Sequence, residues 1–341
     1  MSDAQTSPPN VLFLTSNTED YLSDSLFHGL RLLLGDRVVD YPKSEISYRT
    51  YPHVERIYGR GFTLYGLLED LPIDRTLVLD RARQGAFDLI VFGDIWRYFG
   101  TFVELLPALG GSRVAFLDGA DYPAPYPYAS TFWRVPQWWT LPRAHKRGVY
   151  FKRELTDETA QRRYFMLIPK RFAARLPFAR GLRPIAFSIP EEKIVAEQPA
   201  KTKLFNAHVV DAEVAERLGA TDSYAFEREV EYYADLQASR FGITTKRTGW
   251  DALRHYELAA NGCVPCFRQL EGKPPLCAPH GLEPGRNCLS YSDTEDLLRQ
   301  VDAVDENRYA ELQRGAVEWA RANSTRERAR AFLDQLGFPA P

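Results

Sequence analysis

The chain has 341 residues, of which 45% are hydrophobic and 26% are charged. This composition is typical of a folded globular protein and excludes a disordered or fibrous one, while the length exceeds what one hydrophobic core usually supports. Lysine and arginine (43) nearly balance aspartate and glutamate (45), so the formal net charge is only −2. No general basic field exists to hold a nucleic acid. We therefore expect two domains and no nucleic-acid partner.

No segment has the pattern of a membrane span or a secretion signal. The longest apolar stretches, such as residues 87–95, are less than half of the about 20 residues that a spanning helix needs. The first ten residues lack the positive start and apolar body of a signal peptide. These features predict a cytoplasmic protein with no transmembrane segment, and they leave peripheral association with a membrane open.

The four cysteines lie close together, which argues against a disulfide framework spread through a secreted scaffold. Cys263, Cys266, Cys277 and Cys288, with His280, could be read as zinc ligands. A zinc knuckle usually carries a second tightly spaced pair with polar turns, however, and the residues after Cys263 have the pattern of a strand. We therefore favour buried thiols that pack as small hydrophobic side chains, and we predict no metal site.

The first half of the chain alternates short apolar runs with segments of helical spacing. Residues 11–15 are predicted to form a strand, followed by a helix with leucines at helical spacing over residues 22–33 that Gly35 ends. Further strands are predicted at residues 37–40, 87–92 and 114–117. Continuous apolar strands that alternate with helices favour a parallel sheet covered on both faces.

A second α/β unit follows an irregular, aromatic-rich excursion at residues 122–147. The Pro-, Glu- and Lys-rich residues 183–203 are the natural linker, so we assign residues 1–185 to the first domain and 186–341 to the second. The last helix can cross back to the first domain. Strands are predicted at residues 201–210 and 262–267, and helices at 211–218, 224–241, 251–260, 294–304 and 307–323. Two doubly wound α/β domains place a ligand cleft between the carboxyl ends of their sheets.

The segment FGITTKRTGWDALRHYELAANGCVPCF, residues 241–267, resembles the nucleotide-sugar signature of GT-B glycosyltransferases. It is similar in particular to the CgeB-like group, the spore-maturation-protein-like enzymes, which carry a comparable G-W-D…R-H-[YW]-E…A-x-G-x-[IVL]-P pattern. Residues 150–154 (YFKRE) and 287–293 (NCLSYSD) resemble neighbouring motifs of that group. The resemblance implies an α/β fold of GT-B type, with two Rossmann-like domains facing a central cleft, and a nucleotide-sugar-dependent transferase (EC 2.4).

The residues around the predicted helix at 251–260 suit a nucleotide-sugar donor. Gly249 breaks the preceding structure, and Trp250 and Asp251 begin a helix whose unpaired N–H groups and positive dipole end can face a diphosphate. In similar enzymes a glutamate at the position of Glu257 accepts hydrogen bonds from the two ribose hydroxyls. A carboxylate suits this role because it can accept two hydrogen bonds at once. The alternative is that Glu257 is an exposed helix residue.

Several positively charged residues lie near Glu257 in the sequence. Lys246 and Arg247 come before the Gly-Trp turn, and Arg254 shares a helix face with Glu257. Fixed cations can neutralise a leaving diphosphate in place of a metal, so we expect no cofactor beyond the nucleotide-sugar substrate. Lys246 and Arg247 could equally be a solvated pair. Retaining enzymes of this fold carry a second glutamate eight residues earlier, where this chain has Gly249, so the stereochemistry stays open.

An inverting transferase needs a general base near the acceptor hydroxyl, at the carboxyl edge of the first sheet. Asp94, Asp118 and Asp121 follow predicted strands there. Asp121 is the first choice, because Gly119 lets the loop turn beside the aromatic stretch that would stack on an acceptor. Each aspartate could instead be a turn residue, and His28, in the first predicted helix, is the alternative base.

We therefore predict a metal-independent glycosyltransferase that acts on a glycan, lipid-linked or small-molecule acceptor. Two other classes stay open: a catalytically silent nucleotide- or sugar-binding protein, and a nucleotide-sugar isomerase of the same two-domain shape. The sequence does not identify the donor base, the sugar, the acceptor or the oligomeric state.

Overall fold

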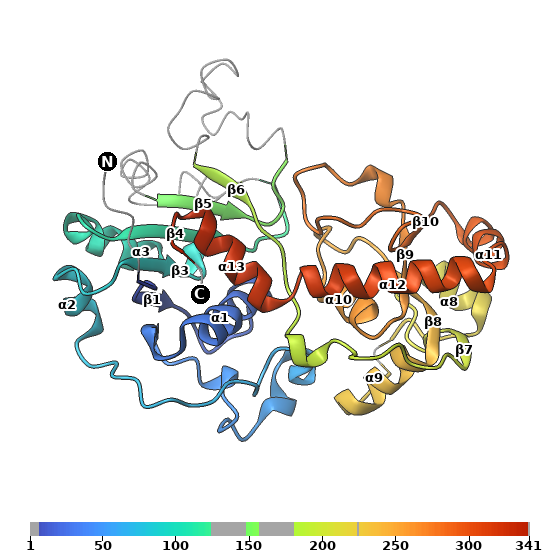
Figure 1. Cartoon of the computed structure of the whole chain (residues 1–341), viewed down its shortest axis with the longest axis horizontal. Coiled ribbons are helices and arrows are strands. Elements are labelled where there is room, and N and C mark those ends of the chain that lie inside the picture. Colours follow the sequence, from blue (N-terminus) through green and yellow to red (C-terminus); the bar gives the residue numbers. More distant parts are fainter. Residues whose placement is uncertain (1–6, 124–147, 157–180, 224, 340–341) are drawn as a thin grey trace, which may run out of the picture.

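The computed structural model has two lobes, each built on a parallel sheet with helices on both faces (Figure 1). It describes residues 7–123, 148–156, 181–223 and 225–339. Most of the aromatic stretch predicted to stack on an acceptor, residues 122–139, therefore lies outside the described residues. Within the described ranges, no helix is both long and apolar enough to cross a membrane.

The first sheet has six parallel strands in the order β2-β1-β3-β4-β5-β6. The strands are β1 Val11–Leu14, β2 Val38–Tyr41, β3 Leu89–Phe92, β4 Arg113–Asp118, β5 Gly148–Lys152 and β6 Leu182–Pro184. The strand order reverses between β1 and β3, which makes the carboxyl ends of these strands the topological switch point where doubly wound folds bind ligands. The sequence did not predict β5 and β6 as strands; β6 is a three-residue edge strand that ends in proline.

Helices α1 (Tyr21–Leu34), α2 (Val78–Arg83) and α3 (Ile95–Leu105) cover the first sheet. The carboxylate of Asp20 caps α1 by accepting hydrogen bonds from the N–H groups of Leu22 and Ser23. Gly35 ends the same helix at a φ of 61°, a backbone conformation that favours glycine. The predicted helix and its end at Gly35 are confirmed.

The second sheet has four parallel strands in the order β10-β9-β8-β7. Its strands are β7 Lys203–Phe205, β8 Ser239–Thr244, β9 Val264–Arg268 and β10 Leu289–Tyr291, and its helices are α8 Ala212–Leu218, α9 Glu229–Ala238, α10 Leu253–Ala260, α11 Thr294–Asp302 and α12 Glu306–Ala322. The predicted helix at residues 224–241 is wrong at both ends, because α9 begins only at Glu229. Helix α9 stops at Ala238 and β8 begins at the next residue, so no turn residue marks the boundary.

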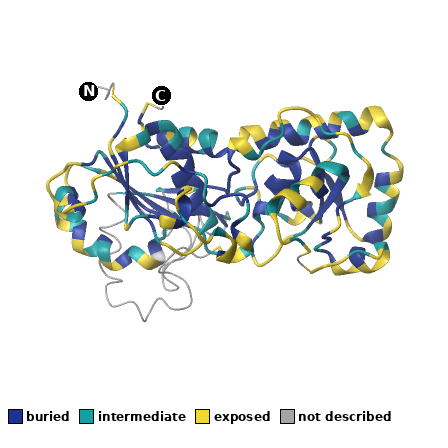
Figure 2. Cartoon of the chain, turned by 90° about the horizontal axis from the view of Figure 1, so that it is seen from below, coloured by how far each residue is buried: buried dark blue, intermediate teal, exposed yellow. Residues whose placement is uncertain are grey.

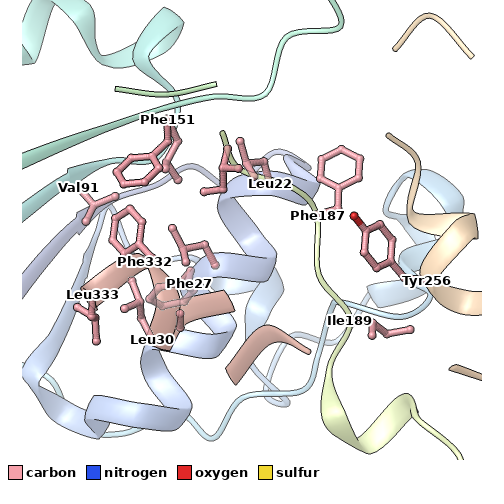
Figure 3. Close-up of a cluster of buried hydrophobic side chains, with 14 of the residues drawn as sticks. Leu22, Phe27, Leu30, Val91, Phe151, Phe187, Ile189, Tyr256, Phe332 and Leu333 are labelled. Carbon is pink, nitrogen blue, oxygen red and sulfur yellow. The ribbon is translucent and has the colours of Figure 1, made fainter. Parts of the chain in front are cut away.

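The last helix, α13 (Thr325–Gln335), returns to the first lobe and packs against α1 (Figure 1). Phe332 and Leu333 lie in the same buried cluster as Phe27 and Leu30 of α1 (Figure 3). The ring of Phe332 also lies 4.8 Å from that of Phe151 on β5, measured between centroids. The C-terminal helix is therefore part of the core of the first lobe.

The chain passes between the lobes at two adjacent points. The N–H of Ile189 donates to the carbonyl of Asn323, and the N–H of Thr325 donates to the carbonyl of Ile189. The buried centre of each lobe is visible in Figure 2. One buried cluster runs from the first lobe through the junction to Tyr256 and Trp319 of the second, whose rings stack at 4.8 Å. The lobes thus share an apolar junction.

We expect Phe332→Ala to destabilise the protein by about 3–5 kcal/mol, because it opens a cavity in the core of the first lobe. Equilibrium unfolding in urea, followed by tryptophan fluorescence, measures this change. Gln335→Ala, at an exposed position of the same helix, is the control and should alter stability by no more than about 0.5 kcal/mol. Equal stability of the two variants would contradict the packing of α13 on the first lobe.

Candidate functional site

A pocket of about 330 Å³ opens at the switch point of the first sheet. It is lined by Glu19, Asp20, Tyr21, Asp94, Gly119, Ala120, Asp121, Tyr122, Arg153 and Phe187. These residues follow β1, β3, β4 and β5 or belong to the segment that leaves the lobe. Four carboxylates and one guanidinium make the pocket acidic, so it suits groups that donate hydrogen bonds, such as hydroxyls and amines, better than anions.

The structure brings two of the three predicted bases, Asp94 and Asp121, to this pocket. Asp118 is fully buried beneath it, 2.9 Å from the ammonium of Lys152, and accepts a hydrogen bond from the hydroxyl of Tyr150. Its burial keeps it from an acceptor in this conformation. The alternative base His28 is buried between α1 and α13, with Nδ1 2.9 Å from the hydroxyl of Thr325, and does not line the pocket.

Asp20 is a pocket carboxylate that the sequence analysis missed. Burial raises the pKa of Asp20 to about 6, and the neighbouring Asp94 carboxylate adds to the rise, while the N–H groups of Ser23 and Leu22 oppose it. A carboxyl group with a pKa near neutrality, held by a helix cap, suits a general base. Its position directly before the first predicted helix was the available sequence signal.

Arg153 joins this pocket to the second lobe. Its guanidinium is 2% exposed and donates to the Gly119 carbonyl and to the Asp121 carboxylate on the pocket side. It also donates to the carbonyl of Asp251 at 2.8 Å and lies 3.1 Å from the carboxylate of Glu154. Arg153 of the YFKRE motif therefore links the two lobes.

Glu154 binds the chain of the second lobe directly. Its carboxylate accepts hydrogen bonds from the N–H of Trp250 at 2.9 Å and of Asp251 at 3.3 Å, and lies 2.8 Å from the sulfur of Cys277. The prediction that these two amides face a diphosphate is corrected, because Glu154 already occupies them. Helix α10 also begins at Leu253, two residues later than predicted. All four cysteines are buried free thiols.

Asp251 also makes hydrogen bonds at the junction between the lobes. It is 4% exposed, and its carboxylate accepts hydrogen bonds from the N–H of Phe187 and the hydroxyl of Tyr256. Burial raises the pKa of Asp251 to about 6. The structure thus gives Asp251 contacts within the protein in place of the predicted donor contact.

Gly249 lies where the two lobes pass close to one another beside the pocket. A Cβ atom at this position would lie 2.5 Å from Oε1 of Glu154 and 2.9 Å from Oδ1 of Asp121. Any larger residue in the loop after β8 would force the carboxylate of Glu154 or Asp121 to shift. Gly249 therefore has a steric role that does not require a ligand.

The predicted cationic residues lie at the carboxyl edge of the second sheet. Lys246 and Arg247 are exposed, and the Lys246 ammonium lies 5.1 Å from the ring centroid of Trp250. Arg254 is half-buried, with Nη1 3.3 Å from Nδ1 of His208. Burial, together with Arg254 and Arg247, lowers the pKa of His208 to about 4. This edge can therefore bind an anion.

His208 was missed because the predicted strand at residues 201–210 included it. Strand β7 ends at Phe205, which leaves His208 at the carboxyl edge of the sheet. His255, by contrast, is fully buried and hydrogen-bonded through both ring nitrogens, to Thr244 and to the Trp250 carbonyl. In the described part of the chain, no group of three or more His, Cys, Asp or Glu side chains is arranged to hold a metal ion.

Glu257 is 8% exposed and is not the exposed helix residue of the alternative interpretation. One carboxylate oxygen accepts a hydrogen bond from the hydroxyl of Thr63 at 2.5 Å, and the other accepts one from the hydroxyl of Tyr232 at 2.7 Å. Burial raises the pKa of Glu257, while the two hydroxyls and Arg254 oppose the rise. Two carboxylate oxygens offer about four acceptor positions, so Glu257 has the capacity for further hydrogen bonds.

Known structures share this arrangement of lobes. HepE (Alr3699) from Anabaena in complex with UDP has a TM-score of 0.55 and 8% sequence identity, over 96% of this chain and 99% of that chain. HepE with UDP-glucose gives 0.54 and 9% over the same shares. A glycosyltransferase from Rickettsia africae gives 0.50 and 11% over 95% and 97%. The chain has the GT-B fold.

The predicted GT-B fold, with two Rossmann-like doubly wound domains, is thereby confirmed. No family model matches the sequence, and no curated protein matches it. The similarity to the CgeB-like group therefore stays a prediction. At these low identities the GT-B likeness concerns the fold alone.

We expect Gly249→Ala to destabilise the protein by about 1–3 kcal/mol, because the added methyl group forces Glu154 or the Asp121 loop to move. Thermal unfolding by calorimetry measures the change. Gly100→Ala is the matched control: a Cβ there meets nothing within 4 Å inside helix α3, so it should stabilise by about 0.5–1 kcal/mol. A neutral effect at position 249 would show that the two lobes do not approach this closely.

Proposed function

We propose that the protein is a glycosyltransferase that moves a sugar from a nucleoside-diphosphate sugar to an acceptor hydroxyl. One observation carries the proposal. The loop after β8, which holds Lys246 and Arg247, passes against the acidic pocket at Gly249, where a Cβ would lie 2.9 Å from Asp121. A donor bound by the cations would therefore have its sugar next to the carboxylates. The HepE structures with UDP and UDP-glucose support this class of donor.

The donor half of the site lies on the second lobe. In our proposal Lys246, Arg247 and Arg254 neutralise the diphosphate, and the carboxylate of Glu257 receives the ribose hydroxyls. Negative charge develops on the diphosphate as the bond to the sugar breaks, and fixed cations stabilise it most effectively there. This supply of cations supports a metal-independent reaction. The CgeB-like signature at residues 241–267 supports the same roles.

The acceptor half is the acidic pocket. Carboxylates accept hydrogen bonds from hydroxyl or amino groups and repel phosphates, so we propose a neutral or amine-bearing glycan or small molecule. In an inverting reaction the acceptor oxygen bonds to the sugar carbon, the diphosphate leaves, and a carboxylate takes the hydroxyl proton. Asp20 now precedes Asp121 and Asp94 as the candidate base, because its pKa of about 6 is near neutrality.

Calorimetric titration with UDP, ADP, GDP and TDP tests the donor site. We expect one of them to bind, and Glu257→Gln to weaken its affinity about 10–100-fold, since hydrogen bonds to a charged group are lost. Glu295→Gln, exposed on α11, is the control and should bind as the parent does. Absence of binding by all four nucleotides would refute the proposal.

Because fixed cations are proposed to neutralise the diphosphate, sugar transfer should persist in EDTA.

The base is tested by Asp20→Asn, Asp94→Asn and Asp121→Asn, which retain size and, at position 20, the helix cap. If the enzyme inverts, one of them should lower the transfer rate about 10²–10⁴-fold without weakening nucleotide binding, and it should abolish the acidic limb of the pH-rate profile. Asp80→Asn on the surface of α2 is the control. Rates within about tenfold of the parent for all three would place the base elsewhere or indicate retention.

A catalytically silent nucleotide-binding protein is the second candidate. Glu154 fills the backbone amides before α10, and Gly249 stands where retaining enzymes have a glutamate. Nucleotide binding without release of diphosphate from any nucleotide sugar, tested with simple sugar acceptors, would support this class.

A further inference from the structure

A loop of the first lobe, residues 58–66, reaches the proposed donor site. Four of its residues other than Thr63 have φ values in the left-handed region: Gly59 at 63°, Arg60 at 58°, Gly61 at 67° and Gly66 at 67°. Thr63 has a φ of 76°, although a β-branched side chain strongly disfavours this conformation. Such strain persists only where surrounding contacts hold it, and it clusters at functional sites.

Thr63 is held by hydrogen bonds to the second lobe. Its side chain is buried, and its hydroxyl donates to Oε1 of Glu257 at 2.5 Å and lies 2.8 Å from the hydroxyl of Tyr233. Its N–H donates to the carboxylate of Glu229 at 2.6 Å. The adjacent Phe62 stacks on Tyr232, with ring centroids 6.2 Å apart. The strained loop therefore contacts the second lobe through Thr63 and Phe62, and one of these contacts is a hydroxyl placed on Glu257.

We infer that Thr63 is a positioning residue of the donor site, which fixes the carboxylate of Glu257 from the opposite lobe so that it can receive two ribose hydroxyls. This inference rests on the proposed function. Thr63 and Tyr232 donate to separate oxygens of Glu257. Each carboxylate oxygen can accept a second hydrogen bond, and a vicinal diol supplies two donors. Donor affinity would then depend on both lobes being in contact.

The charges around Glu257 determine the direction in which its pKa should change when Thr63 is replaced. Burial and Glu229 of α9 raise the pKa of Glu257, whereas Thr63, Tyr232 and Arg254 lower it. Glu229 is itself paired with the ammonium of Lys193 at 2.7 Å. Removing the Thr63 hydroxyl therefore raises the pKa of Glu257 further. Only the ionised carboxylate accepts hydrogen bonds from both ribose hydroxyls. As the pH is lowered, a variant without the Thr63 hydroxyl should therefore lose nucleotide binding at a higher pH than the parent does.

The experiment measures nucleotide affinity against pH for the parent, Thr63→Val and Thr63→Ser, with the best of UDP, ADP, GDP and TDP as probe. Thr63→Val should weaken affinity about tenfold near neutrality and move the acidic limb about one pH unit upward. Thr63→Ser keeps the hydroxyl and should stay within about threefold. Thr50→Val is the control, because its hydroxyl binds Asp70 outside this site.

A second measurement does not need a nucleotide. The carboxyl carbon of Glu257, assigned in ¹³C-glutamate NMR spectra by its loss in Glu257→Gln, should titrate at higher pH in Thr63→Val than in the parent. Unchanged titration, or unchanged or tighter nucleotide binding by folded Thr63→Val, would overturn the inference; tighter binding would show that Thr63 competes with the ribose. A parent protein that binds no nucleotide would instead refute the proposed function, and the inference with it.

Discussion

The buried charges of Arg153 and Glu154 are the constraint on which the two-lobed site depends. A buried guanidinium is stable only when anions and carbonyls surround it, and Arg153 finds them partly on its own lobe and partly on the other. Glu154, its neighbour, holds the backbone of Trp250 and Asp251. Separating the lobes at this point would leave both charges incompletely paired. The acidic pocket and the loop after β8 are therefore held in fixed relation.

This joint also divides the chemistry between the lobes. Carboxylates line the pocket of the first lobe, while Arg247, Arg254 and Lys246 lie at the edge of the second. A substrate with an anionic half and a polyhydroxy half would be oriented by charge, because the cations attract its anionic half and the carboxylates repel that same half. Glu257, buried among hydroxyl donors, is the exception on the cationic side, and its role there depends on staying ionised.

Local patterns in the sequence predicted the features that depend on neighbouring residues. Apolar strands alternating with helical spacing predicted the parallel sheets, and the ends of α1 follow from Asp20 and Gly35. The contacts of Glu154 with Trp250, nearly a hundred residues away, leave no local trace. The same is true of the contact between Thr63 and Glu257. What the sequence could not predict is which polar groups satisfy one another once distant segments meet.

The return of α13 to the first lobe has a consequence for synthesis on the ribosome. The face of α1 that carries Phe27 and Leu30 is covered by Phe332 and Leu333, which follow the whole of the second lobe in the sequence. While the second lobe is being translated, this apolar face is exposed, and exposed faces of this kind promote aggregation. The second lobe, whose sheet and helices α8 to α12 are continuous in sequence, has its elements complete first. The N-terminal lobe is thus the later of the two to mature, against the order of translation.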